Sequence, residues 1–463
     1  MKFSIRKLDI SKILFYAIMS AAAFGIPFGY GIYSATYENW AFRFLRSIKT
    51  DAALVFREKG NILKTRPEHF LQPARYNGSG VTVNKTGNDR EELVFLSGFL
   101  ENSNELRLIR RNGEIVARWI VKFSEIFPDP SHLIKPIFTD WNIDIHGAVA
   151  LPDGSVVFNF EYAGLVKLER CGDVLWALPL RSHHSVELAQ DGGFWVPGQN
   201  FYRTGQPSPF PRFGLPLKED TIMKISDGGE LISEISVPRL FFVNDLEPLF
   251  TSTGRRISPE INWDGELVHL NKIAELRSDM ADDFLLFESG DLLLSLREYN
   301  MILVVNPDTK IIKWWKIGPW KRQHDPEFIP GGKIIVFNNN LYRSAFGTDR
   351  DLSSLNIPRV SNIIELDPVT GKHRIIYGEK HGQELLSVIR GKHEFMPHGG
   401  LLITEFEGGR ILETDASGQV IWEYINRYDQ NEVAELTEAR VYPANYFDVT
   451  DWSCEDNNNQ IGN

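Results

Sequence analysis

The chain has 463 residues, of which 43% are hydrophobic and 24% charged, so most of it is expected to fold into compact domains. Its 61 acidic residues outnumber the 50 basic ones, and the net charge of -11 excludes a basic surface for duplex nucleic acid. Two cysteines, Cys171 and Cys454, exclude a disulfide-rich scaffold, and the sequence leaves open whether they pair.

An apolar run without charge lies between Lys12 and Glu38. About 20 apolar residues suffice for a helix to cross a bilayer, so we predict a transmembrane anchor at residues 13–37 after a tail at 1–12. The basic residues of that tail favour a cytoplasmic N-terminus, which makes this a single-pass inner-membrane protein with its main domain in the periplasm or exterior. A cleaved signal peptide, suggested by the small residues Ala21–Ala23, is the alternative, and the length of the run favours the anchor.

Residues 38–75 are expected to connect the anchor to the main domain. Phe42, Leu45 and Ile48 have helical spacing, which predicts a short helix lying against the membrane or the main domain.

A repeated hairpin pattern fills most of the remaining chain. Two apolar strands flank a turn with Gly, Asp or Asn, and the second strand often ends in Trp, as in the copy from Leu106 to Trp119. The six copies begin at residues 106, 165, 222, 302, 363 and 411. Successive copies are about 50–60 residues apart, except for one larger gap that leaves an insertion around residues 236–268 as a loop or cap.

A second pattern, an apolar strand entered through a Pro, Asp or Gly turn, precedes most of the hairpins, as at Leu151 and Ile329. Each unit therefore supplies about four strands, which is one propeller blade. We predict an all-β fold, a six-bladed β-propeller over residues 76–450, with a flexible tail at 451–463.

Histidines recur at related positions before these turns. His146, His184 and His324 each stand eight residues before a turn glycine, while His269 and His393 precede the turns of two other blades. Matching positions of successive blades converge around one axis, so these five side chains are expected to meet at the mouth of the central channel. His183 and His398 are expected to lie in loops beside them.

The same histidines have simpler interpretations. A single histidine at such a position is more often structural, and converging histidines also suggest a metal. The His-x-His and His-Glu-x-x-His spacings of zinc sites do not occur in the sequence, so we predict no metal.

One stretch resembles a known family. The sequence from Leu293 to Trp315, then Gln323-His-Asp-Pro-Glu-Phe and Phe337-Asn-Asn-Asn-Leu-Tyr-Arg343, resembles the bacterial arylsulfate sulfotransferases, and the resemblance spans about residues 140–425. It implies a six-bladed propeller that moves a sulfuryl group from an aryl sulfate to a phenol through a transient sulfohistidine, with no nucleotide donor and no cofactor.

By motif, the resemblance implies catalytic roles for His269 (His-x-Asn), His324 (His-Asp), Arg343 and His393, the last as the histidine that carries the group. A neutral imidazole can act as such a nucleophile, a second histidine can protonate the departing phenolate, and an arginine can hold the sulfuryl oxygens. The residues expected to bind substrate are His146, His184, Arg297 and Asn338.

Two other functions compete with the transferase. The alternative is a non-catalytic, membrane-anchored propeller that serves as a ligand-binding module or protein scaffold. Quinone-dependent dehydrogenases also have strands ending in Trp, but they need a calcium–carboxylate site that this sequence does not offer. The sequence says nothing about the oligomeric state.

Overall fold

The computed structural model describes residues 10–37, 39–40, 42, 59–63, 65–86, 91–135, 137–210, 213–252, 265–340 and 361–454. The chain divides into two compact units, Met1–Glu68 and His69–Asn463. The first contains the helix α1 (Ile10–Thr36) and the short helix α3 (Lys59–Ile62). Within α1, the 23 residues Leu14–Thr36 are long and apolar enough to cross a membrane, which confirms the predicted apolar helix at the N-terminus.

The second unit is a β-propeller of six sheets, as the repeats predicted. From the innermost strand outwards, blade 1 comprises β27 (Leu436–Tyr442), β3 (Leu93–Leu100), β4 (Ser103–Arg110) and β5 (Ile115–Val121). Blade 2 comprises β6 (Ile145–Ala150), β7 (Val156–Phe160), β8 (Gly164–Leu168) and β9 (Val174–Leu178). Blade 3 comprises β10 (Glu187–Leu188), β11 (Phe194–Tyr202), β12 (Leu217–Ile225) and β13 (Leu231–Ser236).

The other three blades have the same antiparallel order. Blade 4 comprises β14 (Leu270–Glu275), β15 (Leu292–Leu296), β16 (Met301–Val305) and β17 (Ile312–Ile317). Blade 5 comprises β18 (His324–Ile329), β19 (Lys333–Asn338), β20 (Asn362–Leu366) and β21 (His373–Tyr377). Blade 6 comprises β22 (Lys392–Phe395), β23 (Leu401–Glu405), β24 (Arg410–Thr414) and β25 (Val420–Ile425). The six repeated hairpins of the sequence are thus the third and fourth strands of the six blades.

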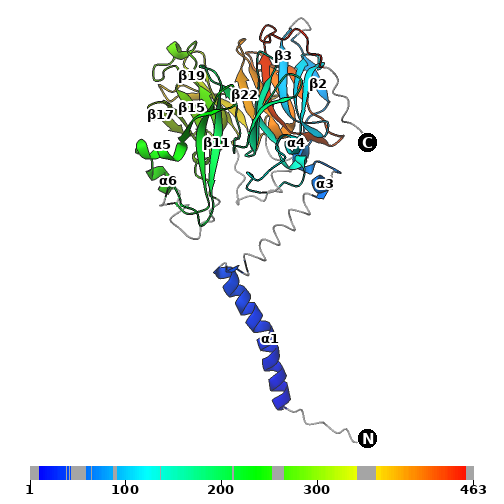
Figure 1. Ribbon diagram of the computed structural model, residues 1–463, viewed down its shortest axis with the longest axis vertical. Helices are drawn as coiled ribbons and strands as arrows, with labels where there is room; N and C mark the ends of the chain where they lie inside the picture. The colour runs from blue at the N-terminus through cyan, green and yellow to red at the C-terminus, as the bar shows by residue number, and fades with distance from the viewer. Residues whose placement is uncertain are drawn as a thin grey trace. The chain divides into compact units, whose positions relative to one another are not determined.

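Both ends of this unit help to close the ring. Of the strands that form the blades, the first in the chain, β2 (Gly80–Asn84), is the outermost strand of blade 6, and the last, β27, is the innermost strand of blade 1. A two-stranded sheet of β1 (Leu71–Pro73) and β26 (Glu432–Ala434) joins the same two regions again. In Figure 1 the light-blue strands at the start of the propeller therefore lie beside the orange and red strands at its end.

Tryptophans at the ends of three hairpins tie blades 1, 2 and 6 to the blade that follows each of them. Nε1 of Trp119, Trp176 and Trp422 donates a hydrogen bond to a backbone oxygen in the hairpin turn of the following blade, at 3.2, 2.9 and 2.8 Å. Trp422, in blade 6, reaches the oxygen of Arg111 in blade 1 and is fully buried. The recurring Trp thus satisfies a turn carbonyl while filling the apolar space between two sheets.

Short helices and one disulfide complete the unit. α4 (Phe123–Ile126) follows blade 1, and α5 (Val237–Val243) and α6 (Pro248–Ser252) occupy the insertion that was expected to form a loop or cap. Single 3₁₀ turns lie at Glu68–Phe70, Asp140–Asn142, Ala281–Asp283, Arg297–Tyr299 and Phe406–Gly408. Cys171, in the hairpin turn of blade 2, forms a disulfide with Cys454. This bond attaches the segment that follows β27 in the chain to blade 2.

Candidate functional site

In the described residues, a histidine stands at the start of the innermost strand in five of the six blades. His146, His324 and His393 belong to β6, β18 and β22. His184 and His269 lie just before β10 and β14, and both have left-handed backbone, with φ of 60° and 55°. A β-bulge occurs at or just after the start of β6, β14 and β18. Bulges redirect side chains at the ends of strands, which suits a site built at a channel mouth.

Four of these rings pack together, as the radial argument predicted. The centroid of His184 lies 4.3 Å from that of His146, 4.9 Å from that of His269 and 6.1 Å from that of His324. All four side chains are buried. Burial is the first cause that lowers the pKa of each ring, so all four imidazoles are neutral near pH 7.

Hydrogen bonds join three histidines and a carboxylate into a row. Oε1 of Glu266 lies 2.7 Å from Nδ1 of His269, whose Nε2 lies 3.2 Å from Nε2 of His184. Nδ1 of His184 in turn lies 2.7 Å from Nδ1 of His183, and Nε2 of His183 lies 3.3 Å from the backbone oxygen of Gly198. Sequence reasoning missed Glu266. It correctly expected His183 in a loop beside the other histidines but gave it no role, and its position next to His184 was the only signal for one.

His324 is held by an asparagine that the sequence did not single out. Nδ1 of His324 lies 2.7 Å from Oδ1 of Asn339 and 3.0 Å from the backbone oxygen of Arg322. The amide of Asn339 donates to the backbone oxygens of Ser387 and Arg390, both at 2.8 Å, which fixes Oδ1 toward the histidine. Since both partners of Nδ1 are acceptors, Nδ1 carries the hydrogen and Nε2 has a free lone pair.

His393 lies in a different environment. Its backbone N–H donates to Oδ2 of Asp325 at 2.8 Å, while its buried ring nitrogens make no hydrogen bond with the described residues. Asp325 also pairs with Lys272 at 2.8 Å, and Lys272 contacts Glu187 at 2.7 Å. Burial lowers the pKa of His393 to about 4. The ring is therefore neutral beside a network of charged residues on the innermost strands β10, β14 and β18.

The other predicted residues have different surroundings. Nη2 of Arg297 lies 3.4 Å from Glu266 and 2.9 Å from Glu298, so its guanidinium borders the histidine cluster. The amide of Asn338 is used within its own blade, because Oδ1 accepts from the backbone of Lys321, just before β18, and Nδ2 donates to Asn362 at the start of β20. Arg343 lies outside the described residues.

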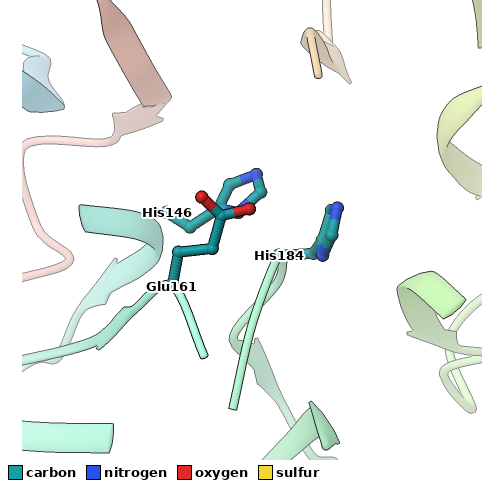
Figure 2. Close-up of side chains that lie close together, drawn as sticks. All are labelled: His146, Glu161 and His184. Carbon is teal, nitrogen blue, oxygen red and sulfur yellow. The ribbon is translucent and has the colours of Figure 1, made fainter. Parts of the chain in front are cut away.

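One group in the cluster has spacing suited to a metal ion. His146, Glu161 and His184 each offer a donor atom, and these atoms lie within 4.8 Å of one another (Figure 2). Arg390, however, holds the other oxygen of Glu161 at 2.5 Å and Asp144 at 2.7 Å. Both nitrogens of His184 face other histidines. A guanidinium at this distance competes with a cation, so the donor set fits a metal poorly and suits an anionic ligand better.

Comparisons with known proteins bear on the whole second unit. The sequence model of the family described as arylsulfotransferase (ASST) matches residues 147–427. No curated protein matches the chain. Among solved structures, a protein of unknown function from Bacteroides caccae is 13% identical, with a TM-score of 0.45 over 72% of this chain and 93% of that one. A virginiamycin B lyase from Staphylococcus aureus with quinupristin is 10% identical, with a TM-score of 0.37 over 77% and 88%. Likenesses this distant say nothing about activity.

Proposed function

Because the chain belongs to the arylsulfotransferase family, we propose that it transfers a sulfuryl group from an aryl sulfate to a phenolic acceptor through a histidine that carries the group transiently. The observation that supports this most directly is the ring of His324. It is neutral, its Nδ1–H is held by two acceptors, and its Nε2 lone pair meets no hydrogen-bond donor among the residues that the structure describes. These are the properties that a nitrogen nucleophile needs.

His324 is therefore our first candidate for the nucleophile, and His393, which its sequence motif suggested, is the second. His324 packs against the other histidines, whereas the ring of His393 lies beside Asp325 and has no partner that fixes its tautomer. Sulfuryl transfer requires a fixed lone pair directed at sulfur, which favours His324.

The remaining polar groups have roles that follow from their chemistry. Arg297 borders the cluster and, with Arg343, would hold the sulfuryl oxygens as negative charge spreads over them. His269 and His184 would exchange protons with the phenol oxygen, and His146 would line the binding site beside them. Asn338 would act mainly by holding together the strand ends of blade 5 that its amide joins.

The test uses the full chain in detergent with 4-nitrophenyl sulfate as donor and phenol as acceptor. We expect nitrophenolate release, measured by its absorbance, and transfer of the sulfuryl group to phenol. His324→Ala should abolish the release of nitrophenolate. His132→Ala should not, because the only hydrogen bond of the His132 ring among the described residues is to the Ala163 backbone oxygen. If His393→Ala abolishes release and His324→Ala does not, the roles are reversed. If intact protein turns over none of a panel of aryl sulfates, the non-catalytic propeller is favoured.

We also propose that α1 anchors the protein and that the propeller lies in the periplasm or an equivalent exterior. The basic N-terminal tail supports this orientation, and so does the Cys171–Cys454 disulfide, because disulfides persist in oxidising compartments. Protein taken from cells under denaturing, non-reducing conditions should resist a maleimide until it is reduced. Immediate labelling of both cysteines would contradict this placement.

A further inference from the structure

The row of Glu266, His269, His184 and His183, here called the histidine chain, contains four contacts that each require a hydrogen. They are the contact of Glu266 with His269, the two ring-to-ring contacts, and the contact of His183 with the Gly198 oxygen. Both end atoms are oxygens that carry no hydrogen when Glu266 is ionised. Every hydrogen within the chain must therefore come from the three imidazoles.

A count of these hydrogens leaves one contact empty. Each neutral imidazole has one N–H, so the three rings supply three hydrogens for four contacts. Four arrangements leave a single contact empty, and they differ in which of the four contacts it is. The contact of His183 with the Gly198 oxygen, at 3.3 Å, is the longest of the four, so we assign the empty place to the Gly198 end. One added proton completes the chain.

We propose that the histidine chain stores the one proton that the two halves of the transfer reaction exchange; this rests on the function proposed above. In the first half, a bond forms between Nε2 of His324 and sulfur, and the bond from sulfur to the aryl oxygen breaks. The departing oxygen takes the stored proton. In the second half, the acceptor phenol forms the new oxygen–sulfur bond, its proton returns to the chain, and the electron pair of the broken nitrogen–sulfur bond returns to Nε2.

The contact between His184 and His269 is where the proton can pass to the substrate. At 3.2 Å it is the longest of the ring-to-ring contacts, and His184 is the member of the chain that packs against His324. A phenol oxygen that enters beside these two rings can replace one nitrogen as the partner of the other.

Charged groups around the chain set how easily it gains and loses the proton. Arg297 and Glu298 face the Glu266 end, and Asp220 accepts from the backbone N–H of His269 and lies 3.7 Å from His183. Lys218 also faces Glu266, and the ring of Tyr162 lies 4.5 Å from that of His183. Burial and then Arg297 lower the pKa of His269, which makes the filled chain a ready donor. An anionic sulfate ester beside the rings favours the filled state.

Glu266→Gln tests the proposal because it retains the shape of the chain while removing its capacity to store a proton. The new amide N–H can donate to Nδ1 of His269, so three neutral rings and one amide fill all four contacts. The matched control is Glu298→Gln, which removes the other carboxylate bonded to Arg297 and leaves all four contacts of the histidine chain in place.

The first measurement compares two donors in full-length protein whose melting curve is unchanged. Phenyl sulfate has a weakly acidic leaving group that needs the proton, whereas 4-nitrophenyl sulfate needs it far less. With Glu266→Gln we expect phenyl sulfate turnover to fall about 100-fold and 4-nitrophenyl sulfate turnover less than about 5-fold. Glu298→Gln should change the two rates by the same factor. An equal loss for both donors in Glu266→Gln would refute the proton store.

The second measurement does not depend on activity. With ¹⁵N-labelled histidine, NMR should show the three rings of the wild-type chain taking up a single shared proton as the pH is lowered, and Glu266→Gln should not take it up over the same range. Three independent titrations in the wild type would overturn the proposal even if turnover is normal. Absence of turnover with normal shared uptake would instead count against the transferase function.

Discussion

The tautomer of His324 should depend on Asn339, and Asn339→Leu tests this dependence. The substitution keeps the approximate volume of the side chain and removes three hydrogen bonds, two to backbone oxygens and one to Nδ1 of His324. The oxygen of Arg322, at 3.0 Å, still accepts from Nδ1. The preference of His324 for the tautomer with the hydrogen on Nδ1 should therefore become weaker but should not disappear.

The sizes of the two effects follow from these contacts. The buried oxygen of Arg390 loses its partner at about 1–3 kcal/mol, whereas that of Ser387 keeps Oγ of Ser361 at 3.2 Å, so the free energy of unfolding should fall by about 1–4 kcal/mol. A partial loss of ring orientation, about 1.4–2.7 kcal/mol in the transition state, corresponds to an aryl sulfate turnover about 10- to 100-fold slower.

A matched variant separates stability from chemistry. Asn426 also donates to two backbone oxygens, those of Phe99 and Ala434 at 2.8 and 3.0 Å, and bonds no histidine among the described residues. Urea unfolding should show similar losses for Asn426→Leu and Asn339→Leu, while only Asn339→Leu slows nitrophenolate release in folded protein. Equal rates in the two variants would refute the assigned role of Asn339.

Two further predictions concern the stability of the propeller. Trp422→Phe removes the hydrogen bond to the Arg111 oxygen and part of a fully buried ring. Urea unfolding should therefore show that the free energy of unfolding falls by about 2–4 kcal/mol. An unchanged midpoint of urea unfolding would mean that this bond between blades 6 and 1 is unimportant for stability. Asp144, 2.6 Å away, raises the pKa of His69 from 6.5 to about 9, so this pair stabilises the fold fully below pH 6.5 and progressively less up to pH 9. Because the His69 side chain is 38% exposed, we expect a loss of only about 1–2 kcal/mol over that range. His69→Gln should flatten the profile, and a parallel profile in the variant would exclude the pair as its cause.

The sequence was most informative about the blades. Each hairpin combines alternating apolar residues with a turn that tolerates left-handed backbone, and both signals are local, so all six hairpins and their order could be recognised. The partner of a hairpin tryptophan could not, because the Nε1–H of Trp422 meets a turn that is distant in the sequence. The disulfide was unpredictable for the same reason, since 283 residues separate its two cysteines.

The candidate site was predictable only where the repeat itself carried the information. Matching positions in successive blades brought His146, His184, His269 and His324 together, as expected from radial symmetry. Glu266 could not be found in this way, because it acts on its neighbour from an insertion that the other blades lack. The roles of these four histidines, and those of His393, Arg297, Asn338 and Arg343, remain predictions.

The double closure of the ring has a consequence for biosynthesis. β27 is the last strand of the ring to leave the ribosome, and it is the innermost strand of blade 1. Until it is synthesised, β3 of that blade therefore presents an unpaired inner edge. A polypeptide that terminates before residue 436 cannot complete the circle, and its imidazoles have no fixed neighbours. Nascent fragments of this chain should therefore depend on chaperones and be degraded rapidly, and the reactive cluster should form only as the final step of maturation.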